Sequence, residues 1–212
     1  GTYLVDQTLL LEGGYGRAIW GESAGGVILK WVGAVGDRCE TPTYRAWCGQ
    51  DCLDQGACNS DPECAGCVWG PRHDVLFHAD GSTRAMFRNL VWDGNGIPNI
   101  TAFDQSYCGN PANNNYETEC DAIGQAAVGR ADIGSTHIDS TFKNAWVGLR
   151  IGHYNVQNSE MTVRRCQFLD NDFGVSNEDF NALNNWFWDC TFDGNRQVGI
   201  TNTLQQHGGG AS

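Results

Sequence analysis

The chain has few basic residues and no long apolar run. Lysine occurs only twice, and 13 Lys and Arg stand against 25 Asp and Glu, which gives a formal net charge of -12. This composition lacks the basic surface that follows nucleic-acid phosphates, so we expect no nucleic-acid partner. No apolar stretch reaches the roughly 18 residues of a spanning helix, so we also expect no membrane span.

Helical faces rich in Glu, Lys and Ala are scarce too, whereas glycine and aromatic residues are abundant. The 212 residues include 28 Gly, 8 Trp and 9 Phe, and 41% are hydrophobic. So many large apolar side chains argue against a disordered chain, and the length suits one domain covering residues 1–212. The many Asn, Asp, Thr and Val residues favour strands and turns over helices.

The C-terminal half repeats a short pattern about every 25 residues. Each unit has an aromatic residue after a short polar stretch, then an apolar segment around a glycine. The polar and aromatic parts are Asp139–Phe142, Arg165–Phe168 and Asp189–Phe192, and the glycine segments are Val147–Leu149, Phe173–Val175 and Val198–Ile200. An earlier unit, Asn89–Asn95, matches Asp189–Asn195 position by position.

Short β-rich units of this period predict an all-β solenoid in which each turn of chain stacks on the previous one. Equivalent positions should then form inward columns. One column would hold Leu90, Ser140, Cys166 and Cys190, and a second would hold Trp92, Phe142, Phe168 and Phe192. We also expect the amides of Asn177 and Asn202 to bond along the stack. A leucine-rich repeat has a similar period, but its leucine frame is absent.

Four N-terminal segments complete the pattern: Gly1–Val5, Thr8–Leu11, Ile19–Glu22 and Val27–Lys30. With the repeats, they resemble the first coils of the pectate-lyase-like, right-handed parallel β-helix superfamily over most of residues 1–33 and 84–204. The resemblance implies a right-handed parallel β-helix that is extracellular or on the cell surface. It also implies binding of an extended polysaccharide along one outer sheet. Because the pattern starts within the first residues, we expect that the chain is a fragment of a longer solenoid.

Two stretches interrupt the repeat and contain most of the cysteines. Residues 34–83 form a predicted loop insert with Cys39, Cys48, Cys52, Cys58, Cys64 and Cys67, and residues 104–132 form a second excursion with Cys108 and Cys120. We predict disulfides among these eight, which indicates an oxidising compartment. A zinc site is the alternative for the Cys48-x3-Cys52 and Cys64-x2-Cys67 spacings. Cys166 and Cys190 are expected to remain buried thiols.

Two groups of charged residues are candidates for catalysis. A glycoside hydrolase needs two carboxyl groups, and Asp170 and Asp172, with Asp193 one repeat later, are the densest set. The alternative is that these residues form turns. A second group, which suits acid–base work or substrate binding, consists of Arg150, His153, Glu178 and Asp179. Solvated loop charges would give the same pattern, and the double-aspartate motif of the polygalacturonase branch is absent.

An eliminating lyase would instead use a basic residue. Arg164 shares its repeat position with Arg88, and the resemblance implies a role for such an arginine as the base. Because the chain is acidic, an anionic polymer would need Ca²⁺ to bridge it. Candidate ligands for calcium are Asp51, Asp54, Asp61 and Glu63, which lack an EF-hand frame.

Three aromatic residues follow one another at Trp186, Phe187 and Trp188. Alternation in a strand cannot bury all three on one side, so at least one tryptophan should face outward. An outward indole would either stack on a sugar ring or pack beneath a loop or a neighbouring subunit.

Three hypotheses for function follow. The first is a secreted polysaccharide lyase or glycoside hydrolase, and the second is a non-catalytic carbohydrate-binding module on the same scaffold. The third is a structural or adhesive protein that assembles through its open ends into a fibre or surface layer.

Overall fold

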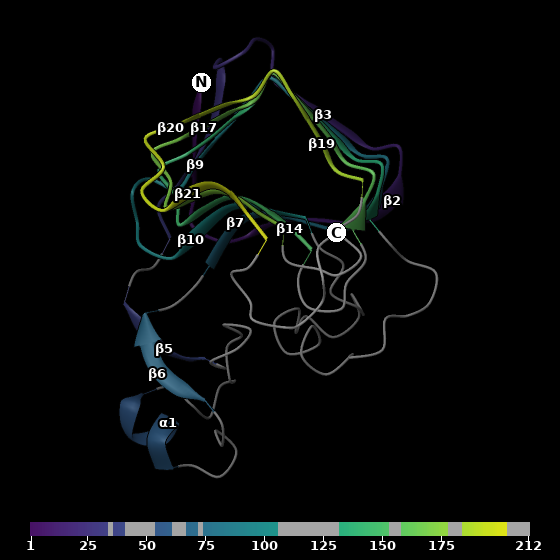
Figure 1. Ribbon diagram of the computed structural model, residues 1–212. Helices are drawn as coiled ribbons and strands as arrows, with labels where there is room; N and C mark the ends of the chain where they lie inside the picture. Colours follow the sequence, from purple (N-terminus) through teal and green to yellow (C-terminus); the bar gives the residue numbers. More distant parts are fainter. Residues whose placement is uncertain are drawn as a thin grey trace.

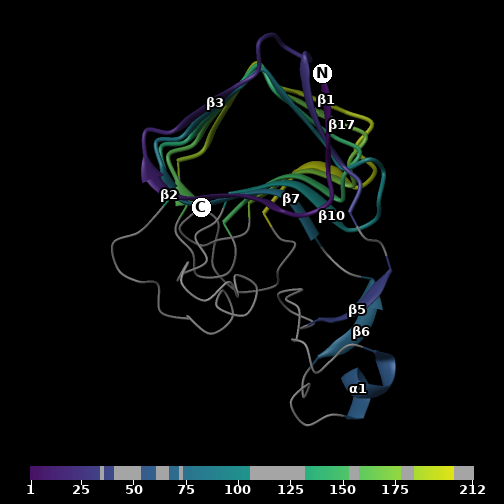
Figure 2. The same ribbon diagram turned by 180° about the vertical axis from the view of Figure 1, so that it is seen from behind.

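The computed structural model describes residues 1–33, 36–40, 54–60, 67–71, 74–105, 132–152, 158–177 and 184–202. Within these ranges the protein is all-β apart from one short helix. Most strands are parallel and lie in three stacked sheets, which form the three sides of a triangle (Figure 1, Figure 2). No helix in the described ranges is long and apolar enough to cross a membrane.

Each sheet contains one strand from each successive turn of the chain. Sheet A contains β1 (Thr2–Val5), β4 (Val27–Trp31), β9 (Leu90–Asp93), β13 (Thr141–Lys143), β17 (Gln167–Leu169) and β20 (Thr191–Asp193). Sheet B contains β2 (Leu9–Tyr15), β7 (Asp74–Thr83), β10 (Ile100–Gln105), β14 (Val147–Ile151), β18 (Phe173–Asn177) and β21 (Val198–Thr201). Sheet C contains β3 (Ala18–Trp20), β8 (Met86–Arg88), β12 (Thr136–Ile138), β16 (Thr162–Arg164) and β19 (Trp186–Trp188).

The chain visits sheets A, B and C in that order and then begins again. In each sheet a new strand pairs in parallel with the strand laid down on the previous visit. This topology is compatible with a parallel β-helix. The all-β, parallel architecture predicted from the repeat is therefore confirmed.

Residues with left-handed backbone conformation occur at the corners between sheets. Between sheets C and A they include Asn89, Asp139, Arg165 and Asp189, between A and B they include Asn95, Gly96, Asn99, Asn144, Asp170 and Gly194, and between B and C they include Gly16, Arg84, Gly134, Glu160 and Asn184. Gly, Asn and Asp tolerate positive φ better than other residues. This preference explains the Asn and Asp residues that recur at one position of the repeat.

The predicted inward columns are both present in sheet A. Register pairs Trp92, Phe142, Phe168 and Phe192 in that order. The rings of Phe168 and Phe192 are parallel, with centroids 4.8 Å apart and planes within 7°. In the neighbouring column, Cys166 is a buried free thiol and Cys190 is a partly buried one. Burial raises the pKa of Cys166 to about 12, so this thiol is protonated at neutral pH.

An amide ladder lies at the corner between sheets A and B. The side chain of Asn171 is fully buried; its Nδ2 donates to the carbonyl of Phe142, and its Oδ1 accepts from the backbone N–H of Ala145. Asn195, one turn later, donates through Nδ2 to the carbonyl of Phe168. Asn171 and Asn195 therefore form an amide ladder that was not predicted. Asn177, which together with Asn202 was predicted to bond along the stack, accepts a bond at Oδ1 from Asn185.

The insert after β4 contains β5 (Asp37–Glu40), which pairs antiparallel with β6 (Val68–Pro71), and helix α1 (Gln55–Ser60). These elements lie outside the three sheets (Figure 1). A disulfide joins Cys39 to Cys58, and Cys67 is also disulfide-bonded. The other predicted disulfide cysteines lie outside the described residues: Cys48, Cys52, Cys64, Cys108 and Cys120.

The boundaries of the two inserts differ from those expected. Residues 74–83, which were assigned to the first insert, form β7 and pair with both β2 and β10 in sheet B. Residues 104 and 105, which were assigned to the second excursion, belong to β10, and residues 106–131 lie outside the described ranges. β11 (Asp132–Ile133) pairs with β15 (Asn158–Ser159).

Candidate functional site

The outer face of sheet C combines aromatic and cationic side chains. Its central column, Ile19, Phe87, His137, Val163 and Phe187, packs in the interior, so the residues on either side of each point outward. The first outward column is Ala18, Met86, Thr136, Thr162 and Trp186, and the second is Trp20, Arg88, Ile138, Arg164 and Trp188. We call these two columns the sheet C face.

Three tryptophans on the sheet C face are open to solvent. Trp20, Trp186 and Trp188 are 67%, 45% and 58% exposed. Alternation in β19 sends Phe187 inward and both neighbouring indoles outward, as the sequence predicted. Trp20 and Trp188 lie four strands apart in one column, which at the usual strand spacing is about 19 Å. The exposed tryptophans therefore lie on the two outermost strands of sheet C, β3 and β19, at opposite ends of the sheet C face.

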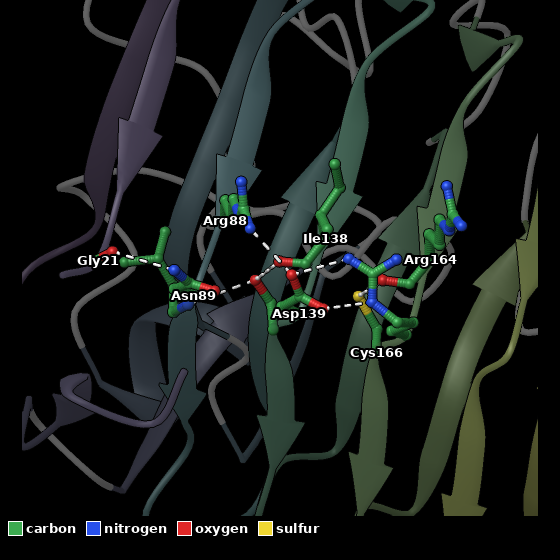
Figure 3. A network of polar contacts seen from close by, with 10 residues as sticks. Gly21, Arg88, Asn89, Ile138, Asp139, Arg164 and Cys166 are labelled. Carbon is green, nitrogen blue, oxygen red and sulfur yellow. Dashed lines mark hydrogen bonds and ion pairs between the residues drawn. The ribbon is translucent and has the colours of Figure 1, made fainter. Parts of the chain in front are cut away.

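A carboxylate at the corner between sheets C and A joins two arginines. Asp139 Oδ1 accepts a bond from Arg165 Nε at 2.6 Å, and Oδ2 accepts one from Arg165 Nη2 at 2.9 Å. Arg88 Nε, from the other neighbouring strand, lies 3.5 Å from Asp139 Oδ2 (Figure 3). The bond from Arg165, followed by its charge and that of Arg88, holds the pKa of Asp139 below its usual value. Asp139 is consequently ionised at neutral pH.

Arg164 differs from its two arginine neighbours. Its side chain is exposed and extends away from Asp139 (Figure 3). Among the residues that the structure describes, its guanidinium forms no ion pair and no hydrogen bond. In a chain with a net charge of -12, the sheet C face thus presents a solvent-exposed cation beside Trp188.

A second polar group lies on sheet B but is buried. His78, Asp104 and Arg150 occupy one register position of three adjacent strands. Asp104 Oδ2 lies 3.5 Å from His78 Nδ1 and 3.8 Å from Arg150 Nη1, and the Arg150 guanidinium lies 5.6 Å from the Trp146 ring centroid. Arg150 was expected on an accessible outer surface, but only 6% of it is exposed, because Asp104 and Trp146 supply partners for a buried cation.

The other members of that predicted group, His153, Glu178 and Asp179, lie outside the described residues. His78 and Asp104 were not among the predicted site residues. Each was assigned to an excursion rather than to a strand of the stack, His78 to residues 34–83 and Asp104 to residues 104–132.

The three candidate catalytic aspartates lie around the corner between sheets A and B. Asp170 has the left-handed conformation of the corner, with φ of 55°. Asp172 forms an ion pair with Arg196, and Asp193 ends β20. Arg164 lies on the sheet C face instead, so the structure does not bring the aspartates and this arginine into one site. Asp170 matches the turn-forming alternative.

Arg164, Trp186 and Trp188, by contrast, lie together on the sheet C face. Sequence reasoning did not select Trp20 or Asp139 as site residues. Trp20 could have been selected, because it occupies the same position of the repeat as Arg88, and therefore as Arg164 and Trp188.

In the described ranges, no group of three or more His, Cys, Asp or Glu residues is arranged to hold a metal ion. Of the calcium candidates, only Asp54 lies in these ranges; Asp51, Asp61 and Glu63 lie outside them.

Comparisons of the chain with protein-family models, with curated proteins and with solved structures find no match.

Proposed function

We propose that this chain is a right-handed parallel β-helix that binds extracellular polysaccharide on its sheet C face. The observation that carries the proposal is the alignment of three exposed tryptophans with Arg88 and Arg164 on one face. The pectate-lyase-like resemblance of the repeats supports the handedness and the class of ligand.

An exposed indole offers a flat apolar surface with a polar N–H, which suits the apolar face of a pyranose ring. Trp20 and Trp188 stand about 19 Å apart along the stack, so a polymer that contacts both must be extended. The guanidinium groups between them donate hydrogen bonds to hydroxyl or carboxylate oxygens. A long polar chain running across the strands would satisfy both kinds of contact.

The geometry favours binding over cleavage. Hydrolysis requires two carboxyl groups facing one glycosidic bond, with one of them able to donate a proton. Asp172 forms an ion pair with Arg196, and Asp170 adopts the left-handed backbone conformation of the corner between sheets A and B. Neither aspartate lies on the face that carries the tryptophans. The sheet C face itself offers stacking surfaces and hydrogen-bond donors.

An extracellular or cell-surface location is part of the proposal. The Cys39–Cys58 disulfide favours an oxidising compartment. The acidic composition and the polysaccharide ligand agree with such a location.

Calorimetric titration against hydroxyethyl cellulose, xylan, glucomannan, polygalacturonate and alginate tests the proposal, with and without Ca²⁺. We expect binding to at least one polymer, weakened 10-fold or more by Trp20→Ala or Trp188→Ala, since each removes a stacking surface worth about 1–3 kcal/mol. Tyr3→Ala is the matched control, because Tyr3 is an exposed aromatic on sheet A.

Binding that is unaffected by both tryptophan variants, or absent for every polymer, would overturn the proposal. Mass spectrometry of the same mixtures reports on catalysis. Fragments that have gained water would reveal a hydrolase, and unsaturated fragments would reveal a lyase.

Self-assembly is the second candidate function. The outermost strands of the sheets expose apolar side chains, including Tyr3 and Leu4 on β1 and Val198 and Ile200 on β21. Edge strands with exposed apolar groups can pair with another chain. Filaments or a rise in sedimentation coefficient with concentration, abolished by Leu4→Lys, would support this function. A monomer at all concentrations would reject it.

A further inference from the structure

Asp139 contacts two arginines beside the sheet C face: Arg88, which belongs to the face, and Arg165, at the adjoining corner. It stands in the corner column after β12, where it follows Ile138 and is flanked by Arg88 on one side and Arg165 on the other. Its side chain is only 20% exposed, whereas those of the two arginines are 50% and 43% exposed. The carboxylate therefore holds both guanidinium groups at the surface while remaining largely covered itself.

Two consequences follow for the face. Asp139 fixes the position of Arg165 with a two-point hydrogen bond and attracts Arg88 from the opposite side. It also supplies one negative charge against the two positive charges that it contacts. Arg164 is left as the cation without an ion pair in the described part of the chain.

We propose that Asp139 is a specificity-determining residue of the sheet C face. By compensating and positioning Arg88 and Arg165, it limits the attraction of the face for acidic polymers relative to neutral ones. The inference rests on the proposed polysaccharide binding. It does not require Asp139 to touch the polymer, so Asp139 is a positioning residue.

The repeat itself provides the test variants. Asp139→Asn removes the charge and keeps a side chain that tolerates positive φ, and Asn89 already occupies the equivalent position one turn earlier. Asp189→Asn is the matched control. It removes a carboxylate from the same corner column, where Asp189 adopts φ of 53°, without breaking the contact to Arg88.

Affinities should be measured for hydroxyethyl cellulose and carboxymethyl cellulose, which share one backbone and differ in charge. We expect Asp139→Asn to raise the ratio of acidic to neutral affinity about 2- to 5-fold at low salt, because two guanidinium groups lose their counter-charge. The gain should vanish near 1 M salt, where the screening length is about 3 Å. Asp189→Asn should change the ratio less than Asp139→Asn does.

An unchanged ratio in Asp139→Asn, or an equal rise in Asp189→Asn, would overturn the inference. Trp188→Ala separates this failure from failure of the proposed function. If it weakens binding of both polymers while the ratio in Asp139→Asn stays constant, the face binds polysaccharide but Asp139 does not set its selectivity. Arg88→Gln provides a second measurement if Asp139→Asn does not fold, and it should lower the ratio.

Discussion

The rings of Phe142 and Phe168 lie parallel, with centroids 5.0 Å apart and planes within 6° of each other. The spacing matches the separation of neighbouring strands, so the same side chain in successive turns stacks without a change of rotamer. Phe192 extends this column beyond Phe168. One residue type at one repeat position thus supplies both core packing and strand register.

We expect Phe168→Ala to destabilise the protein by roughly 3–5 kcal/mol. Phe168 is fully buried and has ring partners on both sides, so truncation leaves a cavity that two stacked rings cannot fill. Urea unfolding followed by tryptophan fluorescence measures the loss. Phe192→Ala is the control, since Phe192 is only partly buried and should cost less. Equal costs would contradict the role assigned to the stack.

The second stability prediction concerns the buried side-chain amide of Asn171. Asn171→Ala removes the acceptor for the Ala145 N–H and the donor to the Phe142 carbonyl, and each buried polar group left alone costs about 1–3 kcal/mol. Asn195→Ala should cost less, because Asn195 lies closer to solvent. Chemical denaturation of both variants checks the order. A larger loss of unfolding free energy in Asn195→Ala would show that the amide nearer to solvent contributes more to the ladder than Asn171 does.

These two sites show what the sequence could predict. The aromatic column repeats one residue type at one spacing, and that periodicity is visible without coordinates. The amide ladder of Asn171 and Asn195 was missed because each turn contains several amides, and the bonding expected of Asn177 and Asn202 remains a prediction. Which amide points inward depends on the conformation of the corner, which the repeat alone does not specify.

The buried charges of sheet B illustrate a different limit. An arginine such as Arg150 is normally solvated, so sequence analysis placed it at the surface. The carboxylate beside it belongs to Asp104, which lies on a neighbouring strand distant in sequence and was assigned to the second excursion. His78 contacts the same carboxylate from β7, which could not be recognised because of the proline and cysteine content of residues 34–83.

The buried imidazole of His137 makes the free energy of unfolding depend on pH. Burial lowers the pKa of His137 to about 3, so the imidazole stays neutral in the folded protein while it titrates near 6.5 in the unfolded chain. Between these values the unfolded state binds one more proton. This residue therefore lowers the unfolding free energy as pH falls from about 6.5 towards 3, by up to roughly 1.4 kcal/mol per pH unit.

The measurement compares the pH dependence of urea unfolding in the wild type and in His137→Phe. The ring of His137 stacks on Phe87 at 5.0 Å, so an aromatic replacement suits the column. We expect a shallower slope between about pH 4 and pH 6 in the variant, whatever its stability at neutral pH. An unchanged slope would show that His137 is not the titrating group.

Removing the shared carboxylate of sheet B gives the final prediction. Asp104→Asn removes the carboxylate charge that lies 3.8 Å from Arg150 Nη1 and 3.5 Å from His78 Nδ1, and breaking a buried pair from one side costs about 3 kcal/mol or more. The double variant Asp104→Asn, Arg150→Gln should lose less stability than the sum of the two single variants, because each single variant already removes the same ion pair. A double-mutant cycle by urea unfolding measures this coupling. Strictly additive losses would mean that Asp104 stabilises sheet B through His78 rather than through Arg150, and His78→Gln would then reproduce the effect.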